Sequence, residues 1–329
     1  MPKCVTEAHK ELMHYTTSSG LAGIVSSGCV WATNAVALND SQEIIHFFDT
    51  RLIDIIREEV TNAINELIKN PRIAQRIESD GGSDKVAATQ TEIVTNLLRE
   101  GTLLFHQPHI FSLSAITNDR VRDNGLLSQW RGYGHDGGYA LVFDSNEFEE
   151  LLKSEVQQHF YQHMQWGDVY YYGLPDAEQR SNEEIVDAET KLRAGIRELH
   201  LDPKPSTMEE SYDAMITLSC LFKHWGFHEE QEVRVVAIPP NQEVLSAAKD
   251  AGETRKPREI SVISRGGLLV PYIELFKGGS GQSTKLPIKR VIVGPHPLST
   301  TRKKTVEALL KSNGYDAEVK ISEIPYLGR

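Results

Sequence analysis

Three short stretches of the chain concentrate side chains that can do chemistry. They are His14-Tyr15-Thr16, Gln129-Trp130-Arg131-Gly132-Tyr133, and residues 223–236, which read KHWGFHEEQEVRVV. Together they supply imidazole, carboxylate, guanidinium and aromatic groups, which can bind an anionic ligand and stabilise charge that develops during a reaction. The stretches are far apart in the sequence, so they form one site only if the fold brings them to a common hollow.

The third stretch leads into a strand-like run, VRVV. Because side chains alternate along a strand, Glu232 and Arg234 should share one face of it, and Glu230 should join them. Such a row of carboxylate, guanidinium and carboxylate is either a structural salt bridge or a catalytic acid held by a neighbouring cation. The residues alone leave both interpretations open.

The second stretch belongs to a glycine-rich loop, residues 128–143, which read SQWRGYGHDGGYALVF. Glycine lets a ligand approach the main chain closely, which favours a ligand-facing loop. The letters of residues 132–137 match the dinucleotide fingerprint GxGxxG, but that motif requires a strand before it and a helix after it. Here a helical pattern precedes and a strand pattern follows, so we reject a Rossmann fold. The structural alternative is a helix-to-strand turn in which Trp130 fills the core.

Patterns of apolar residues predict the elements that must position these side chains. We expect a strand at 13–15, a short helix at 21–25 and a return strand at 29–32. A helical insertion should follow at about 41–101, broken by a loop at Pro71 and at 79–85, with further helices at about 145–226. Ser145 or Asn146 should cap the first of these later helices. Since short β-branched runs fill the C-terminal third, we expect residues 1–329 to form a single α+β domain.

Composition sets limits on partners and location. The chain has 329 residues, a formal net charge of −11 and three scattered cysteines. The negative charge does not favour nucleic acid as a partner, although it leaves room for a local basic patch. No run approaches the roughly 20 apolar residues of a membrane span, and the N-terminal sequence lacks the apolar segment of a secretory leader. We therefore expect a cytoplasmic protein with no membrane association, no disulfides and no metal.

A metal-dependent nuclease is one alternative function. Carboxylates that could gather around magnesium, with Lys223 beside them, are Asp40, Glu43, Asp144, Glu230 and Glu232. Carboxylate oxygens are the ligands that magnesium prefers, but the sequence does not bring these residues together.

Four blocks in order carry a resemblance to a known family. They are HYTTSSGLAGIVSSGCVWAT followed by LNDSQE, FSLSA followed by LLSQWRGYGHDGGYALVFD, FKHWGFHEEQEVRVV, and IKRVIVGP. Across residues 12–296 the chain resembles a widespread bacterial family of unknown function. The first block of that family is similar to the opening of ADP-ribosyltransferase-like folds. The resemblance implies a mixed, largely antiparallel sheet core of that type with a helical insertion.

The resemblance also implies NAD as the ligand and a role for individual residues. His14 would hydrogen-bond a ribose hydroxyl of NAD, and Tyr15 or Tyr133 would stack on the nicotinamide. Glu232 would be the acid that stabilises the oxocarbenium-like ribosyl centre, with Glu230 as its competitor. The remaining members of the ligand-binding set are Arg131, placed near the pyrophosphate, and Thr16, Trp130 and Arg234.

The functional expectation that follows has two branches. In one, the protein is an enzyme that transfers ADP-ribose to a macromolecular acceptor or hydrolyses NAD, in bacterial stress or phage defence. In the other, the same residues form a non-catalytic nucleotide-sensing or protein-interaction module. Oligomerisation is open in both branches.

Overall fold

The computed structural model describes residues 5–37, 41–101, 107–134, 137–174, 183–202, 205–278 and 285–325. The chain divides into two units, each with its own set of internal contacts. Unit 1 comprises Ala35–Pro108 and Tyr170–His224, and unit 2 comprises Lys3–Asn34, His109–Val169 and Trp225–Arg329. The insertion predicted at about 41–101 is therefore part of unit 1, together with helices from a second, distant segment.

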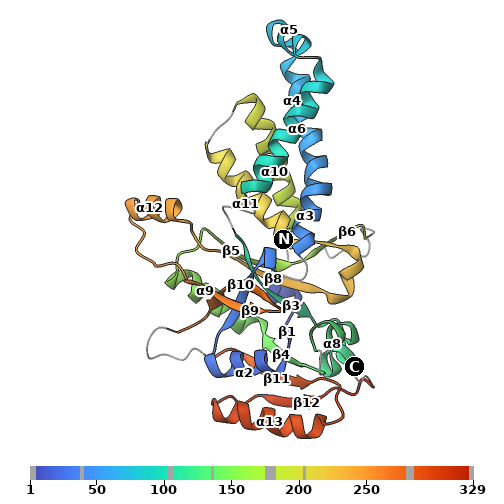
Figure 1. The fold of residues 1–329 in the computed structure, drawn as a ribbon, viewed down its shortest axis with the longest axis vertical. Helices are drawn as coiled ribbons and strands as arrows, with labels where there is room; N and C mark the ends of the chain where they lie inside the picture. Colours follow the sequence, from blue (N-terminus) through green and yellow to red (C-terminus); the bar gives the residue numbers. More distant parts are fainter. Residues whose placement is uncertain are drawn as a thin grey trace. The chain divides into compact units, whose positions relative to one another are not determined.

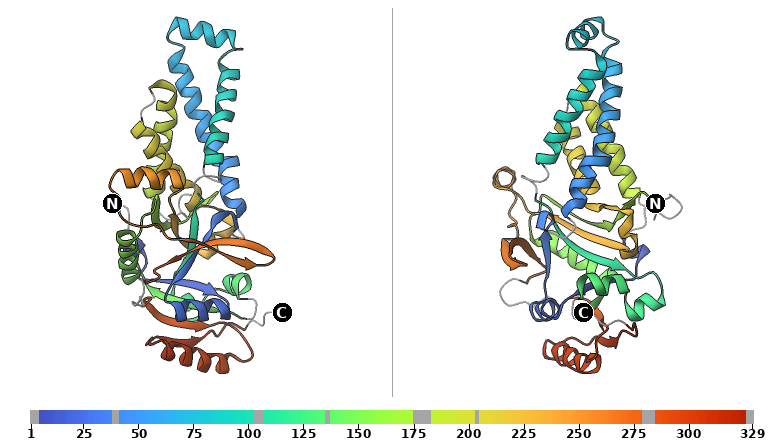
Figure 2. Two further views of the ribbon diagram at one scale, coloured as in Figure 1. Left: turned by 60° about the vertical axis from the view of Figure 1, so that its left-hand side comes forward. Right: turned by 45° about the vertical axis from the view of Figure 1, so that its right-hand side comes forward.

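Unit 1 is mainly helical. Its first segment forms η1 (Ala35–Ala37), α3 (Ser41–Phe47), the π-helical η2 (Phe48–Leu52), α4 (Ile53–Leu67), α5 (Pro71–Ser79) and α6 (Ser83–Glu100). Helices α4 and α6 run side by side, with α5 across their far end (Figures 1 and 2). The loop predicted at Pro71 is wrong, because α5 begins there. Asn70 accepts a hydrogen bond from the Arg72 N–H as the N-cap, and proline fits the first position of a helix.

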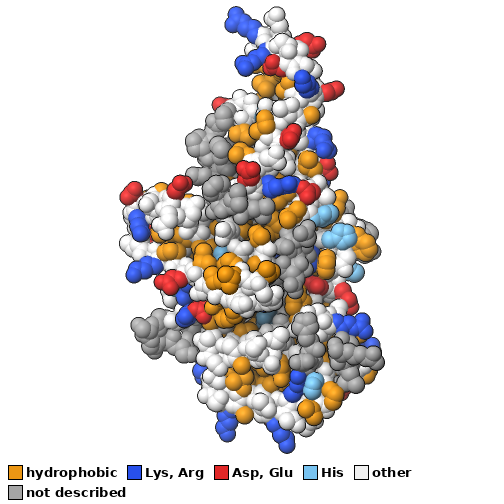
Figure 3. Space-filling view, viewed as in Figure 1, with side chains coloured by type: hydrophobic (Ala, Val, Ile, Leu, Met, Phe, Trp, Pro, Cys, Tyr) orange, Lys and Arg blue, Asp and Glu red, His pale blue; other side chains and the backbone are white. Residues whose placement is uncertain are grey.

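The second segment of unit 1 completes the helical packing. It forms β6 (Tyr170–Tyr172), α10 (Glu183–Leu201), α11 (Pro205–Leu221) and β7 (Phe222–His224). Strands β6 and β7 pair as a two-stranded parallel sheet, and α10 packs against both α11 and α4. Basic and acidic side chains are interspersed over the helices of this unit (Figure 3), as in the exposed pair of Arg57 with Asp54. Isolated pairs of this kind contribute little to stability.

Unit 2 is built on a 10-stranded sheet. Its strands are β1 (Glu11–Thr16), β2 (Val30–Asn34), β3 (His109–Ala115), β4 (Tyr139–Asp144), β5 (His163–Asp168), β8 (Glu232–Ile238), β9 (Ile260–Arg265), β10 (Leu268–Leu275), β11 (Ile288–Val293) and β12 (Glu318–Ile321). The order is β12-β11-β4-β1-β3-β2-β10-β9, and β8 joins β3 to β5. Among the described strands of this sheet, β11 and β12 pair in parallel and the other neighbours pair antiparallel, so the prediction of a mixed, largely antiparallel α+β fold is confirmed.

One face of this sheet carries the main hydrophobic core. Leu12, Leu113, Leu141 and Val233 point into it from four neighbouring strands, and Phe148 fills it from the covering helix α9 (Ser145–Gln158). Helices α2 (Ser18–Ser27) and α13 (Ser299–Ser312) add further apolar side chains to the same core. The remaining helices of unit 2 are α1 (Val5–Ala8), α7 (Asp119–Asn124), α8 (Leu127–Tyr133), η4 (Trp225–Glu230) and α12 (Gln242–Asp250).

Local signals predicted the first strand-helix-strand segment well. Thr17 caps α2 by accepting a hydrogen bond from the Gly20 N–H, and Gly28 ends the helix in the left-handed conformation. The predicted cap of α9 is wrong by one residue. Asp144 is the cap, because its carboxylate accepts hydrogen bonds from the Asn146 and Glu147 N–H groups, both at 3.0 Å.

Candidate functional site

The sheet of unit 2 forks along one edge of β3. Leu12 and Met13 of β1 pair with Ala115 and Ser114 at one end of this edge. At its other end, Thr33 and Asn34 of β2 pair with Ile110 and His109. Between these two contacts, β1 leaves β3 to follow β4, and β2 leaves it to follow β10. We call this place, where β1 and β2 separate beside residues 111–113 of β3, the fork. The N–H and C=O groups of β3 that face the fork have no neighbouring strand to pair with and need other hydrogen-bond partners.

His14 supplies one of these partners. Its Nδ1 lies 2.9 Å from the carbonyl oxygen of Ser112, and its ring packs on Phe111 with centroids 4.6 Å apart. A carbonyl oxygen only accepts, so Nδ1 carries the proton. Burial lowers the pKa of His14 to about 4, although the hydrogen bond to Ser112 opposes that shift. The imidazole is therefore neutral near pH 7, and its Nε2 is a hydrogen-bond acceptor.

Tyr15 and Trp130 occupy core positions instead of ligand-binding ones. The Trp130 side chain is 1% exposed, and its indole N–H donates to the Asn124 carbonyl over 2.9 Å. The Tyr15 hydroxyl accepts a hydrogen bond from the Leu126 N–H, and its ring meets Trp130 edge-on at 4.9 Å. Burial raises the pKa of Tyr15. The ligand contacts predicted for Tyr15 and Trp130 do not fit this packing, whereas the alternative in which Trp130 fills the core does.

The glycine-rich loop joins α8 to β4, which confirms the helix-then-strand order and the rejection of a Rossmann motif. His135 and Asp136 lie outside the described residues. Gly137 and Gly138 have positive φ angles of 89° and 61°. A Cβ on Gly137 would lie 2.3 Å from the Pro295 carbonyl oxygen, and one on Gly294 would lie 1.6 Å from that of Gly137. These glycines permit close packing of two backbones.

Three of the predicted binding residues lie on accessible parts of unit 2. Arg131 and Tyr133 are exposed on α8, with Tyr133 at 37% of its surface, and Thr16 is partly exposed at the end of β1. Their predicted contacts with a nucleotide stay predictions.

Glu232 and Arg234 form a buried ion pair on β8. The Arg234 Nε and Nη2 atoms lie 2.8 Å and 3.0 Å from the two carboxylate oxygens of Glu232, and both side chains are buried. The prediction that they share a strand face is confirmed. The prediction that Glu230 joins that face is wrong. Glu230 ends the 3-10 helix η4, and the positive φ of Gln231, 46°, separates it from the strand.

The strand register decides which of the candidates lie together. Met13 and Glu232 both pair with Ser114, so these three side chains share one face of the sheet. His14 is opposite Leu141, which points into the main core on the other face. The expectation that His14 and Glu232 point into one hollow is therefore wrong. Tyr15 and Trp130 belong to a smaller core cluster that also contains Met13.

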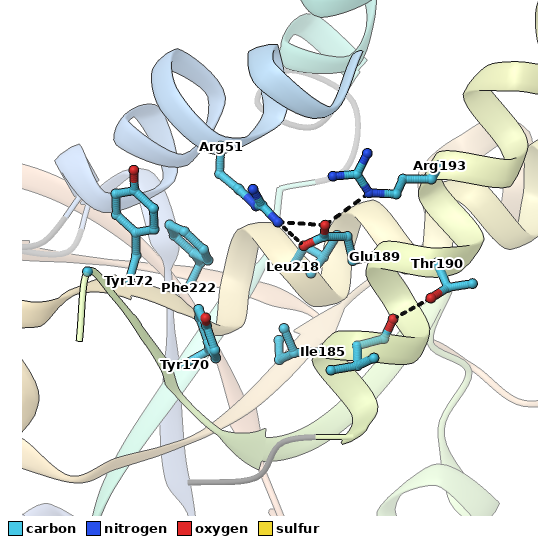
Figure 4. Close-up of a pocket in the computed structure, with 11 residues that line it drawn as sticks. Arg51, Tyr170, Tyr172, Ile185, Glu189, Thr190, Arg193, Leu218 and Phe222 are labelled. Carbon is cyan, nitrogen blue, oxygen red and sulfur yellow. Dashed lines mark hydrogen bonds and ion pairs between the residues drawn. The ribbon is translucent and has the colours of Figure 1, made fainter. Parts of the chain in front are cut away.

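Unit 1 contains a cavity of about 380 Å³ that was not predicted from the sequence (Figure 4). Tyr170, Tyr172 and Phe222 form one side of it, and Arg51, Glu189 and Arg193 form the other. Arg51 and Glu189 are 138 residues apart, and neither belongs to a motif. The sequence indicated no more than that both residues lie in predicted helices, and this does not bring their side chains together.

The described residues contain neither a cluster of metal ligands nor a membrane-spanning helix. No group of three or more His, Cys, Asp or Glu side chains there could hold a metal ion. Of the predicted nuclease carboxylates, Asp40 lies outside the described residues, as does the side chain of Glu43. None of the described helices is both long enough and apolar enough to cross a membrane.

Comparison with known proteins gives one match. A sequence model of the family described as "Protein of unknown function (DUF2971)" matches residues 129–235. The matched range begins in α8 and ends in β8, so it includes Arg131 and Glu232, while His14 lies outside it. No curated protein matches the chain, and no solved structure does. This part of the chain is thus similar to a family whose function its description leaves open.

Proposed function

We propose that unit 2 is an ADP-ribosyltransferase-like domain that binds NAD at the fork. The observation that carries this proposal is the neutral imidazole of His14, held by Ser112 where β1 and β2 part. Its Nε2 has no hydrogen-bond partner in the described part of the chain, so it can accept a hydrogen bond from a ribose hydroxyl. Exposed Arg131 and Tyr133 are the further candidates for contacts with the pyrophosphate and the nicotinamide.

The enzymatic form of the proposal needs one anionic group. The bond between C1′ of the ribose and the nicotinamide nitrogen breaks, and nicotinamide leaves with the bonding electrons. A carboxylate stabilises the positive charge that develops on the ribosyl centre. An acceptor hydroxyl or water then attacks C1′ and releases its proton to solvent. Glu232 is the carboxylate predicted for this step, and because the register places it on the sheet face opposite His14, the enzymatic form stands only if Glu232→Gln loses turnover.

The second candidate is a nucleotide-sensing module that binds NAD without turnover. Two observations favour it. Both carboxylate oxygens of Glu232 are already bonded to Arg234, and the register places Glu232 on the opposite face from His14. In this form of the proposal the Glu232–Arg234 pair stabilises the sheet and takes no part in chemistry.

Binding and turnover are therefore measured separately. Purified protein is titrated with NAD by calorimetry, and nicotinamide release is followed with NAD labelled in the nicotinamide ring. We expect His14→Gln to weaken NAD binding at least tenfold. Turnover that is lost in Glu232→Gln, with NAD binding retained, supports the enzyme, and binding without turnover in the wild type supports the sensor.

Two controls make the outcome decisive. Glu243→Gln changes an exposed carboxylate on α12 and should leave both binding and turnover unchanged. Far-ultraviolet circular dichroism verifies that each variant is folded. Failure of the folded wild-type protein to bind NAD at millimolar concentration would overturn the proposal in both forms.

A further inference from the structure

The cavity of unit 1 has an aromatic side formed by β6, β7 and the end of α11. Tyr170 is opposite Phe222 in the strand register. The Phe222 ring stacks on Tyr170 at 5.9 Å and on Tyr172 at 5.3 Å, both at 29°. Ile185 and Leu218 extend this apolar surface (Figure 4). Parallel rings beside aliphatic side chains suit a flat, apolar group such as an aromatic ring.

The opposite side of the cavity is charged. Arg51 Nη2 lies 2.6 Å and 2.7 Å from the two carboxylate oxygens of Glu189, and Arg193 Nε lies 3.0 Å from one of them. Glu189 thus bridges two guanidinium groups (Figure 4). The hydrogen bonds from Arg51 hold the pKa of Glu189 below its ordinary value against the opposing effect of burial. Arg193 is also bonded to Glu58 and Glu59. Glu189 is the one carboxylate that contacts Arg51 among the described residues, so Arg51 is the main cation that a further anion would meet.

Both arginines retain donors for such an anion. Arg51 donates to Glu189 through its Nη2 atom. Arg193 donates to Glu189 through Nε, and to Glu58 and Glu59 through Nη1. Within the described ranges, Arg51 Nε and Nη1 and Arg193 Nη2 have no partner. A guanidinium group offers five N–H donors in a planar fork, which matches carboxylate and phosphate oxygens.

The backbone around Arg51 provides an independent indication of a site. Arg51 lies in η2, a π-helical turn between the α-helices α3 and α4. Single π-turns are rare within helices, and they occur frequently at functional sites. The turn changes the helical phase at the position from which Arg51 reaches the cavity.

We propose that this cavity binds a small planar ring joined to an anionic group. The ring would lie against the side formed by Tyr170, Tyr172 and Phe222, and the anion would take the free N–H groups of Arg51 and Arg193. A volume of about 380 Å³ falls in the range of small-molecule sites. A mononucleotide and an aromatic carboxylate share this chemistry, and the test separates them.

The test compares ligands that carry both groups with ligands that carry one. Binding of AMP and of indole-3-carboxylate is measured by calorimetry, with adenosine, indole and inorganic phosphate as partial ligands. We expect AMP or indole-3-carboxylate to bind at least tenfold more tightly than its own fragments, and the tighter of the two identifies the source of the ring. Equal binding of a fragment, or no binding of either compound at millimolar concentration, would overturn the proposal.

Variants place the binding in this cavity. Arg51→Gln and Tyr172→Ala change partly exposed side chains and should each weaken binding at least tenfold in protein that remains folded. Lys191→Gln is the matched control, because Lys191 pairs with Asp187 on the surface of α10. His14→Gln separates this site from the fork, because it should leave the binding of indole-3-carboxylate, which has no ribose, unchanged. Binding that survives Arg51→Gln would contradict the assignment.

Discussion

The imidazole of His14 donates its Nδ1 proton to the carbonyl oxygen of Ser112 over 2.9 Å, at the point where β1 leaves the edge of β3. This side chain satisfies a main-chain acceptor that a neighbouring strand would satisfy in an unbroken sheet. The opposite ring nitrogen is left as an acceptor for a ligand. The fork is therefore both a feature of the fold and the basis of the proposed nucleotide site.

The pKa of His14 predicts a pH dependence of stability. The folded-state value of about 4 lies below the ordinary value of 6.5, so the unfolded state binds the proton more tightly. The free energy of unfolding should therefore fall as the pH is lowered from 6.5 to 4, by about 3 kcal/mol from this residue. Urea denaturation of the wild type and of His14→Gln across this range checks it. Equal pH slopes in the two proteins would contradict the prediction.

The Glu232–Arg234 pair predicts a non-additive mutational cycle. Arg234→Met leaves the Glu232 carboxylate buried without its cation, which should cost about 3–5 kcal/mol of unfolding free energy. Adding Glu232→Gln removes the uncompensated charge and should recover more than half of that loss. Urea denaturation of both single variants and the double variant measures the coupling. Additive losses would show that the pair does not act as a unit.

Gly137 and Gly132 offer a matched test of the glycine-rich loop. Gly137→Ala forces a Cβ toward the Pro295 carbonyl oxygen at a positive φ, and we expect a loss of about 2 kcal/mol or more. Gly132 lies in α8 with open space at its Cβ position, so Gly132→Ala should be neutral or stabilising by up to about 1 kcal/mol. Melting temperatures of the two variants distinguish close backbone packing from general flexibility of the loop. A similar change in both would contradict the packing account.

A second buried ion pair in unit 2 predicts a further loss of stability in acid. Burial alone would raise the pKa of Glu155, but hydrogen bonds from Arg258 and Tyr161 hold it below its ordinary value. The wild type should therefore lose stability as the pH falls below about 4.5, because the unfolded state takes up a proton that folded Glu155 binds only at lower pH. Arg258→Met should lower the unfolding free energy by about 3 kcal/mol at pH 7 and by less near pH 4. A loss that does not depend on pH would contradict this role.

The local parts of the fold were predictable from the sequence. Thr17 and Gly28 mark the ends of α2 because capping depends on residues within one turn of the helix. Asn70 and Pro71 carried a similar signal for the start of α5. Proline is also common in loops, however, and the sequence-based prediction placed a loop there. The capping hydrogen bonds of these helices join residues that are close in the sequence, so local patterns are sufficient to predict them.

The candidate site was less predictable, because it depends on register between distant strands. Alternation placed Glu232 beside Arg234 correctly, since both belong to one strand. It failed for Glu230, because the backbone turns at Gln231 before β8 begins. The face occupied by His14 follows from the pairing of β1 with β4, about 125 residues away, which no local pattern reveals.

A crystal structure of the protein with NAD bound tests the central claim most directly. We expect nucleotide density at the fork, with a ribose hydroxyl within hydrogen-bond distance of His14 Nε2 and with Nδ1 still bonded to Ser112. A saturated crystal in which NAD lies elsewhere in the protein, with His14 making no contact to it, would contradict the account.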